Sequence, residues 1–346
     1  MVGKYIKESA LVNANFKCDY INLSTSTTVD DIGKGGWVKL KRFLQIAIQT
    51  YKTLKNFNPD LVYLTLTSTG IGFFKDALIV LLIKLCKGKL IYHFHNKGIR
   101  LKQDKWLYNL AYKFVFKNSR VILLAKPLYT DIKKYVPESN VHYCANGVPI
   151  KIISDINGKE QNKIPQVLFL SNLIKSKGVL ILLKACSLLK RKNIRFNCIF
   201  VGGEGDITTN EFQKKIAEMQ LQDFVSYLGK KYGIEKDTIY RNSDIFVLPT
   251  YYANECFPLV LLEAMQYTLP VISTPEGAIS AIVKDGETGF LVQQKNTKEL
   301  ADKLEYLIFN SKLRLELGKN GRDLYLRKFT LRKFEENLVR ILKQVN

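Results

Sequence analysis

Short, continuous apolar runs alternate along the chain with longer segments in which apolar residues recur every three or four positions. In the first half, LVYLTLT, KLIYHFH and the run Arg120–Leu124 are apolar runs of strand length, and helical patterns lie between them. Continuous runs of this length are typical of strands buried on both faces, and strand and helix in alternation favour a parallel sheet. The pattern therefore predicts an α/β protein.

The chain begins with a helical pattern, MVGKYIKESALVN, and no strand precedes it. We expect a strand at Lys17–Asn22, a long helix from about Val38 to Asn56, and helices at Asp76–Lys87 and Lys126–Tyr135. This order resembles the second half of a βαβ unit. It leads to the interpretation that the first domain lacks its first strand.

The second half repeats the alternation more regularly. Its expected strands are QVLFLSN, RFNCIFVGG, FVSYLG, DIFVLP, PVISTP and GFLVQ, and its expected helices start near Lys177, Thr209, Lys236, Pro258, Ala278 and Thr297. Asn-Gly and Pro interrupt both patterns between Asn146 and Pro165. We therefore expect domains at 1–147 and 148–328, with a C-terminal helix in 329–346 whose apolar stripe docks on the first domain.

Length and composition agree with two soluble domains. The 346 residues are too many for one ordinary core, and 47% are hydrophobic. The six cysteines form no CxxC pair or Cys/His cluster, which favours reduced thiols in a cytoplasmic protein. The longest charge-free apolar run, Ala77–Ile83, is far shorter than the roughly 20 residues that span a bilayer.

The chain is strongly basic, with 53 Lys and Arg against 31 Asp and Glu, and residues 1–148 hold 23 basic and 9 acidic side chains. In the segment 101–120, lysines alternate with aromatic residues. It is either an interfacial helix on anionic lipid or a helix packed on the sheet with a solvated basic edge. Peripheral membrane contact through the first domain is therefore an open expectation. No recognised nucleic-acid-binding module accompanies the charge, so we expect no nucleic acid partner.

Two glutamates, Glu255 and Glu263, lie eight residues apart in LPTYYANECFPLVLLEAMQYTL. Pro258 and the apolar run after it predict a buried helix, so Glu255 precedes the helix and Glu263 lies on it. Two glutamates taken at random would be ordinary surface acids. Glu263, however, is surrounded by uncharged residues, and a carboxylate there needs partners such as the hydroxyls of a ribose.

Backbone N–H groups from Phe257 to Val260 would open this helix, and they can point at an anionic or hydroxyl-rich ligand near Glu255. The helix rises roughly 8 Å from Pro258 to Glu263. That length suits a ligand with polar groups at both ends and a phosphate between them, which describes a nucleotide sugar.

Two glycine-containing turns follow strands of the second half, and the first also contains lysines. Lys177 and Gly178 are expected in the first turn of a helix, where a lysine opposes the helix dipole unless an anion is bound, so Lys177 is a phosphate-site candidate or else a solvated lysine. Gly202, Gly203 and Gly205 lack the spacing of a dinucleotide fingerprint, and we interpret them as a tight turn.

In the first half, His95 follows a strand and precedes Asn96. Ligands bind at the carboxyl ends of parallel strands, so His95 is a site candidate, although a capped or core histidine is the alternative. We assign His93 to the opposite face of the strand, as a structural residue. The chain has no DxD motif, P-loop or Cys/His metal cluster, so a metal-bridged diphosphate is not the favoured chemistry and no metal cofactor is expected.

Several motifs occur together in one order: SNLIKSKG, FVGGEG, DIFVLPTYYANECFPLVLLEAMQYTLPVIST and IVKDGETGFLV. In these the chain resembles the retaining GT-B glycosyltransferases of family 4 (glycosyl transferases group 1). The resemblance covers most of the chain. It implies two Rossmann-like domains facing across a cleft, a UDP-sugar or GDP-sugar donor, a saccharide or lipid-linked acceptor, and a role in surface-polysaccharide biosynthesis.

The resemblance also implies roles for individual residues. Glu255 would contact the transferred sugar and Glu263 the ribose, Lys177 would hold the diphosphate, and His95 would reach the cleft beside the sugar. The implied catalytic residues are Glu255, His95 and Lys177, and the implied donor-binding residues are Asn172, Lys177, Gly203, Glu255, Cys256, Phe257, Pro258, Leu259 and Glu263.

The chain departs from the family's pattern in two places. Asn172 stands where the family usually has an arginine, so Lys177 would neutralise the diphosphate largely alone. The first strand and its Gly-rich loop are absent before MVGKYIKES. We therefore expect that Met1 is an internal methionine of a longer reading frame or that the gene is truncated. Two alternatives remain: an inactive remnant or non-catalytic subunit, and a nucleotide-sugar epimerase of the same fold.

Overall fold

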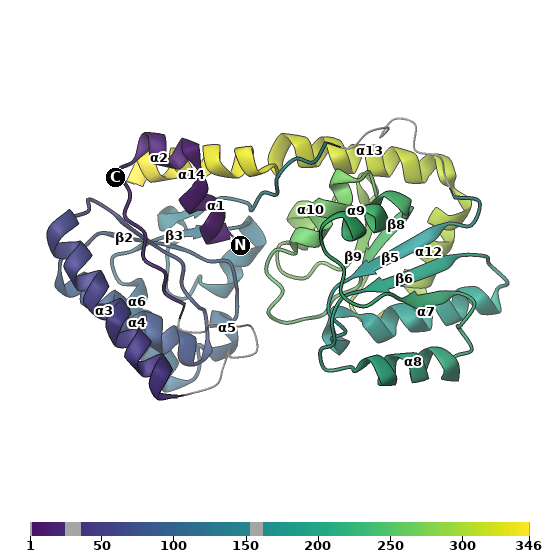
Figure 1. Ribbon diagram of the computed structural model, residues 1–346, viewed down its shortest axis with the longest axis horizontal. Coiled ribbons are helices and arrows are strands. Elements are labelled where there is room, and N and C mark those ends of the chain that lie inside the picture. The colour runs from purple at the N-terminus through teal and green to yellow at the C-terminus, as the bar shows by residue number, and fades with distance from the viewer. Residues whose placement is uncertain (1, 25–35, 153–161, 346) are drawn as a thin grey trace. The chain divides into compact units, whose positions relative to one another are not determined.

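The computed structural model describes residues 2–24, 36–152 and 162–345, and it divides into two compact units (Figure 1). Unit 1 comprises Met1–Ala145 together with Phe334–Asn346, and unit 2 comprises Asn146–Lys333. Each unit is built on a parallel sheet with its own helices.

The sheet of unit 1 has four strands in the order β1-β2-β3-β4, which is also their order in the sequence. All neighbours pair in parallel, and the strands are β1 Val62–Leu64, β2 Leu90–His93, β3 Arg120–Leu123 and β4 Val141–Tyr143. Successive right-handed crossovers that advance in one direction place their helices on one face of a sheet. The helices that join β1 to β2 and β2 to β3 therefore cover the same face.

The helices of unit 1 include a layer in which α4 contacts both α3 and α6. Aromatic rings join α4 to α6, with the rings of Phe73 and Tyr112 4.6 Å apart. The helical elements are α1 Val2–Glu8, α2 Ala10–Asn15, α3 Trp37–Phe57, α4 Gly70–Leu85, α5 Ile99–Lys102, α6 Trp106–Phe116, η2 Lys126–Asp131 and η3 Glu138–Asn140, with α14 Leu331–Val345 contributing its residues from Phe334 onward.

Two expectations for unit 1 are wrong. Lys17–Asn22 forms no strand, because side chains bind the local backbone there instead. The Asp19 carboxylate accepts the Tyr20 N–H at 2.8 Å, and the Asn22 side chain accepts the Ser24 N–H at 3.0 Å. The expected helix at Lys126–Tyr135 is a 3₁₀ helix that ends at Asp131.

The sheet of unit 2 has six parallel strands in the order β10-β9-β8-β5-β6-β7. They are β5 Gln166–Leu170, β6 Asn197–Val201, β7 Val225–Tyr227, β8 Ile245–Leu248, β9 Val271–Ser273 and β10 Gly289–Leu291. The chain runs outward from β5 through β6 to β7, and then returns to β8 on the other side of β5. The strand order thus reverses between β5 and β8, and loops at the carboxyl ends of such a pair form the usual ligand site of an open α/β sheet.

The helices of unit 2 follow the expected alternation. They are η5 Lys175–Lys177, α7 Val179–Arg191, α8 Thr209–Glu218, α9 Gly233–Asn242, α10 Leu259–Gln266, α11 Ile279–Ile282, α12 Thr297–Phe309 and α13 Ser311–Lys328. The sequence reading did not predict α13. Its two glycines lower helix propensity, but a Cβ on Gly318 would lie 1.9 Å from the Thr268 carbonyl oxygen, so close packing requires a glycine there.

No helix within the described ranges is both long and apolar enough to cross a bilayer.

Candidate functional site

The loops that follow β5 and β8 meet at the point where the strand order of unit 2 reverses. The Tyr251 N–H donates to the Ser176 carbonyl oxygen at 2.7 Å. Gly178 has a φ of +90°, and a Cβ there would lie 2.3 Å from the Pro249 carbonyl oxygen. A side chain at position 178 would push the two loops apart, so the glycine is required for the contact.

This contact brings Lys177 and Glu255 together. The Lys177 ammonium donates to Oε2 of Glu255 at 2.5 Å, and the Glu255 side chain is 8% exposed. The Thr250 hydroxyl donates weakly to the same oxygen at 3.5 Å, and the Lys177 Nζ lies 4.9 Å from the centre of the Tyr252 ring. Lys177 precedes α7 as the last residue of η5, rather than lying in the helix's first turn. The anion beside it is the Glu255 carboxylate.

The loop that carries Glu255 is also fixed from its other side. The Ala278 N–H donates to the Cys256 carbonyl oxygen at 2.8 Å, and Gly277 approaches so closely that a Cβ would lie 2.2 Å from the Glu255 carbonyl oxygen. Gly277 has a φ of +56°. The backbone of Glu255 is therefore held in place while its side chain faces Lys177.

The helix α10 begins immediately after this loop, with Pro258 as its N-cap and no side-chain capping bond. The first N–H groups of a helix have no acceptor within the helix, so the first turn from Leu259 is a site where donors can meet an anion. Cys256 and Phe257 are buried behind it, and the Phe257 ring makes an edge contact with Phe329. The expected opening by a proline is confirmed.

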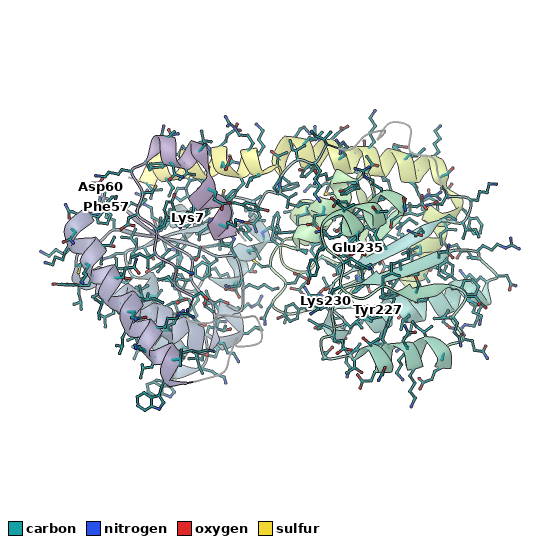
Figure 2. All side chains as sticks on the ribbon, in the orientation of Figure 1. Lys7, Phe57, Asp60, Tyr227, Lys230 and Glu235 are labelled. Carbon is teal, nitrogen blue, oxygen red and sulfur yellow. The ribbon has the colours of Figure 1, made fainter. Side chains whose placement is uncertain are left out.

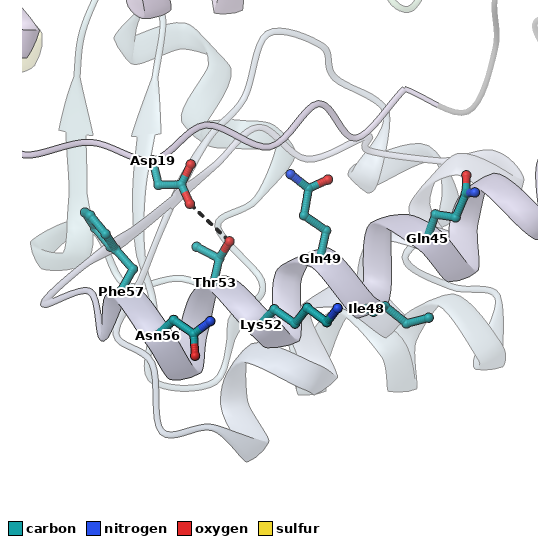
Figure 3. A pocket seen from close by; sticks show the side chains of 8 residues that line it. All are labelled: Asp19, Gln45, Ile48, Gln49, Lys52, Thr53, Asn56 and Phe57. Carbon is teal, nitrogen blue, oxygen red and sulfur yellow. Dashed lines mark hydrogen bonds between the residues drawn. The ribbon is translucent and has the colours of Figure 1, made fainter.

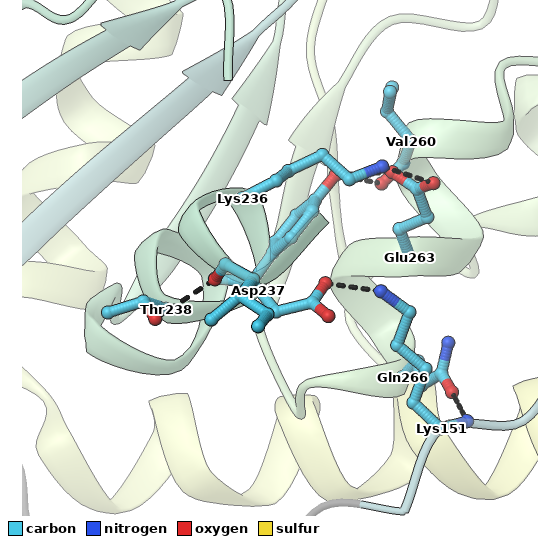
Figure 4. A network of polar contacts seen from close by, with 9 residues as sticks. Lys151, Lys236, Asp237, Thr238, Val260, Glu263 and Gln266 are labelled. Carbon is cyan, nitrogen blue, oxygen red and sulfur yellow. Dashed lines mark hydrogen bonds and ion pairs between the residues drawn. The ribbon is translucent and has the colours of Figure 1, made fainter. Parts of the chain in front are cut away.

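Glu263 lies on α10 one turn further on, and α9 supplies partners for both of its oxygens (Figure 4). The Lys236 ammonium donates to Oε1 at 2.8 Å, and the Tyr240 hydroxyl donates to Oε2 at 3.0 Å. Tyr240 is fully buried and its ring stacks on Tyr267 at 5.2 Å. Burial, and secondly the Glu263 charge, raise the pKa of Tyr240 well above its ordinary value, so the hydroxyl stays a donor.

A second set of contacts joins α9 to the start of unit 2. The Lys151 ammonium pairs with Asp237, and the Lys151 backbone N–H donates to the Gln266 side chain (Figure 4). Asp237 and Gln266 lie beside the residues that contact Glu263. Lys151 thus links α9, which carries Lys236 and Tyr240, to α10, which carries Glu263.

Asn172 and Gly203 pair across the loops after β5 and β6. The Gly203 N–H donates to the Asn172 side-chain oxygen at 3.1 Å, and the Gly203 carbonyl accepts the Leu173 N–H at 2.7 Å. A Cβ on Gly203 would lie 2.3 Å from Cε of Lys230, which Figure 2 labels near Tyr227. Lys230 therefore brings a flexible cation to the loop where Asn172 offers none.

His95 lies in unit 1, after the carboxyl end of β2. Its ring centre is 4.1 Å from that of His93, so the two histidines lie on the same side of the strand. The expectation of opposite faces is wrong, because side chains two positions apart in a strand share a face. The Asn96 side chain accepts the Ser68 N–H at 2.9 Å and ties the end of β2 to the segment after β1.

His93 is fully buried, and its Nδ1 lies 2.6 Å from the Tyr63 hydroxyl. Burial, and secondly the neighbouring His95, lower the pKa of His93 well below its ordinary value. Burial likewise raises the pKa of the Cys144 thiol to about 12. These groups are neutral near pH 7, which fits the structural role expected for His93.

Unit 2 contains every predicted site residue except His95, which belongs to unit 1. Within unit 2, Lys177 contacts Glu255 and Asn172 contacts Gly203. Sequence reasoning missed the residues that hold the two glutamates in place, which are Thr250, Tyr252, Lys236 and Tyr240. It also missed Lys230 beside Gly203. Lys236 and Tyr240 are four positions apart and share one face of α9. The sequence shows this spacing, but it does not show that α9 lies beside α10. The contacts of Lys236 and Tyr240 with Glu263 show this.

A surface hollow of about 590 Å³ lies along α3 in unit 1, outside the predicted site (Figure 3). It is lined by Asp19, Gln45, Ile48, Gln49, Lys52, Thr53, Asn56 and Phe57. The Asp19 carboxylate accepts the Thr53 hydroxyl at 3.1 Å. Among the described residues, no group of three or more His, Cys, Asp or Glu side chains is arranged to hold a metal ion.

Comparison with known proteins identifies the class to which this fold and site belong. The model of the family described as glycosyl transferases group 1 matches residues 151–324. The match covers the whole sheet of unit 2 and the glutamate-bearing segment. The chain belongs to this family.

Individual relatives cover more of the chain. An N,N'-diacetylbacillosaminyl-diphospho-undecaprenol alpha-1,3-N-acetylgalactosaminyltransferase of Campylobacter jejuni is 28% identical over 324 residues, which is 88% of this chain and 79% of the relative. The capsular polysaccharide biosynthesis glycosyltransferase CapM of Staphylococcus aureus is 28% identical over 197 residues, 54% of this chain and 50% of the relative. Like CapM, two further curated relatives are matched over only about half of their length, 44% and 55%.

Solved structures show the same architecture. The crystal structure of Anabaena Alr3699/HepE in complex with UDP superimposes with a TM-score of 0.73 at 19% identity, covering 87% of this chain and 82% of that one. The fold is therefore GT-B, with two Rossmann-like domains, as the sequence predicted.

Proposed function

We propose that this chain is a retaining family 4 glycosyltransferase that moves a hexose from a nucleoside-diphosphate sugar to a saccharide or lipid-linked saccharide acceptor. The observation that supports this best is the Lys177–Glu255 pair, 2.5 Å apart, where the loops after β5 and β8 meet. The C. jejuni and S. aureus relatives, by their names, work in saccharide assembly. These names support a proposed role in surface-polysaccharide biosynthesis, and we propose the cytoplasm as the site of the reaction.

In this proposal, donor binding replaces Glu255 by the diphosphate as the partner of the Lys177 ammonium. The diphosphate of a UDP-sugar or GDP-sugar takes over the Lys177 ammonium, together with the N–H groups of the first turn of α10. Glu255 is then released from its ion pair and accepts hydroxyls of the sugar. Glu263 accepts the ribose hydroxyls, and the Gly203 loop, the Asn172 side chain and the segment Cys256–Leu259 shape the walls.

The chemical step breaks the bond between the anomeric carbon and the leaving phosphate oxygen. Negative charge collects on the diphosphate as this bond breaks, and Lys177 with the α10 amides stabilises it. The acceptor hydroxyl approaches from the face that the diphosphate leaves, its oxygen bonds to the anomeric carbon, and its proton passes to the leaving phosphate oxygen. The anomeric configuration is thereby retained. His95 is proposed to assist the transfer from unit 1. The scheme uses a fixed cation of the chain where other enzymes use a metal ion.

Replacing Glu255 tests the proposal. Glu255→Gln keeps the volume but removes the charge, and we expect kcat for sugar transfer to fall about 100-fold or more. Glu218→Gln is the matched control, since Glu218 is an exposed acid paired with Lys215 on α8. Turnover of the purified protein is measured with UDP- and GDP-hexoses. Equal turnover in both variants would remove Glu255 from the mechanism.

The role given to Lys177 predicts how transfer responds to chelators. In the proposal, the Lys177 ammonium neutralises the negative charge of the diphosphate in place of a metal ion. We therefore expect EDTA to leave sugar transfer unchanged, whereas Lys177→Gln lowers it strongly. Transfer that stops in EDTA and returns with Mg²⁺ or Mn²⁺ would contradict this part of the proposal.

A further inference from the structure

Three neighbouring helices of unit 1, α3, α4 and α6, expose large apolar side chains where a water-facing helix carries polar ones. α4 lies between the other two, and all three belong to one layer (Figure 1). The apolar face is defined here as the exposed large apolar residues of this layer: Trp37, Val38, Leu40, Leu44, Ile48, Tyr51, Ile71, Leu78, Leu81, Leu85, Trp106, Leu107, Leu110 and Phe114.

The centre of the apolar face is the exposed stripe of α4. Ile71, Leu78 and Leu85 recur every seven residues and are 81%, 54% and 72% exposed. The charged residues of α4 do not interrupt the stripe. Asp76 is buried, Lys75 pairs with it at 3.4 Å, and Lys84 donates to the Phe114 carbonyl at 2.7 Å. Apolar patches of this kind mark surfaces that bind a membrane or a protein.

The charge around the apolar face has one sign. The three helices contain eight Lys and Arg and a single acid, the buried Asp76. Lys41, Lys52, Lys55 and Lys113 are exposed beside the apolar residues. A second copy of this chain would bring the same positive charge to the contact, which disfavours self-association. Apolar side chains flanked by lysines match the boundary between the acyl chains and the head groups of an anionic bilayer.

The positions of the tryptophans also favour a lipid bilayer as the partner of the apolar face. The chain has two, and both lie on the apolar face, Trp37 being 86% and Trp106 73% exposed. A tryptophan ring has an apolar body and a polar N–H, so it is stable at the level of lipid head groups.

We propose that the apolar face of unit 1 lies in the head-group region of an anionic lipid bilayer, with α4 inserted and the lysines of α3 and α6 against lipid phosphates. This goes beyond the proposed donor chemistry and does not depend on it. Of the two alternatives given above for segment 101–120, the proposal selects the interfacial helix. It also extends the membrane contact to α3 and α4.

Vesicle binding of the full chain, without any donor, tests the proposal. The probes are vesicles of phosphatidylcholine alone and of phosphatidylcholine with about one third phosphatidylglycerol. We expect flotation with the anionic vesicles and a blue shift of tryptophan emission, both weakened by salt. Since unit 2 contains no tryptophan, the emission reports unit 1 alone.

Paired variants locate the contact. Leu78→Glu with Leu81→Glu puts two charges on the α4 stripe, and we expect the partition coefficient to fall about tenfold or more. Ile234→Glu with Phe309→Glu is the matched control, because these residues of unit 2 are 85% and 68% exposed. The control is expected to bind like the parent. Lys113→Glu, a milder change, should weaken binding to anionic vesicles only.

Three results would overturn the proposal. The first is that flotation and tryptophan emission are the same with anionic and with pure phosphatidylcholine vesicles. The second is that the α4 variant binds like the parent while its thermal unfolding is unchanged. The third is that the control variant loses as much binding as the α4 variant. If sedimentation instead shows a dimer that the α4 variant dissociates, and vesicles do not bind, the occupant is a second copy of the chain.

Discussion

Glu263 has its two carboxylate oxygens held by different groups, a lysine that water can reach and a tyrosine that it cannot. The Lys236 side chain is 23% exposed, whereas Tyr240 is fully buried. A ligand can displace or share the ammonium, but the buried hydroxyl is fixed by the ring packing around it. Tyr240 is therefore a positioning residue, and it orients the carboxylate that we propose for the ribose.

Replacement of Tyr240 by phenylalanine tests this role. Tyr240→Phe removes one hydrogen bond to Glu263, and we expect the KM for the nucleotide sugar to rise about 3- to 10-fold with a smaller change in kcat. Tyr325→Phe is the control, since its buried hydroxyl donates to the Val148 carbonyl at 3.2 Å and does not contact Glu263. Both variants lose stability, but only the first should change KM.

At the scale of elements, the contact between the loops after β5 and β8 depends on Gly178. Gly178→Ala introduces a methyl group 2.3 Å from the Pro249 carbonyl oxygen at a φ of +90°. We expect it to lower the free energy of unfolding by about 3 kcal/mol or more, from left-handed strain and overpacking together. Urea unfolding of the purified protein measures this.

Gly229→Ala separates the effect of left-handed backbone strain from that of overpacking. Gly229 also has a positive φ, +66°, but a Cβ there would meet nothing within 4 Å. The expected loss is about 1 kcal/mol, which is the backbone strain alone. Equal losses in the two variants would show that the close approach to Pro249 does not hold the loops together.

The elements of this fold differ in how far the sequence predicts them. The strands of unit 2 are continuous apolar runs, and their positions were predicted. The helix α13 was missed because its glycines lower helix propensity, and one of them, Gly318, serves a tertiary contact with Thr268 that no local pattern reveals. Lys17–Asn22 was wrongly predicted as a strand because Asp19 and Asn22 bind local N–H groups.

The candidate site shows the same division. The sequence could indicate Glu255, Glu263 and Lys177, because each is a charged residue at the start of a helix or within an uncharged run. Their partners could not be found in this way, since the contact of Lys236 with Glu263 depends on α9 packing beside α10. The pairing of Lys177 with Glu255 depends on β5 and β8 being neighbours.

At the scale of the whole molecule, all three histidines belong to unit 1: His93, His95 and His142. Burial lowers the pKa of His93 and of His142, and for His142 the nearby Arg120 and Arg340 act in the same direction. The unfolded chain therefore binds protons at these sites before the folded chain does as the pH falls. The contribution of these two histidines to stability is complete above a pH of about 6.5 and decreases progressively as the pH falls below it.

Unit 1 should accordingly be the acid-sensitive part of the protein. We expect its free energy of unfolding to fall by up to about 1.4 kcal/mol per pH unit below pH 6.5 for His93 alone. Tryptophan emission during urea unfolding reports unit 1, because Trp37 and Trp106 both lie there. His93→Gln keeps a partner for Tyr63 and removes the titration, so a variant with the parent's pH slope would contradict this assignment.

The Lys177–Glu255 pair also has a consequence for ionic conditions. An isolated lysine would recruit a dissolved anion from the buffer, and a phosphate ligand would have to compete with that anion. Lys177 instead carries an internal counter-ion, which is covalently part of the chain and independent of the medium. The charges of Lys177 and Glu255 thereby balance each other. Under the proposed function, we expect inorganic phosphate alone to compete poorly, since it offers no sugar hydroxyls to receive the displaced Glu255. We therefore expect selectivity for the intact donor over its fragments.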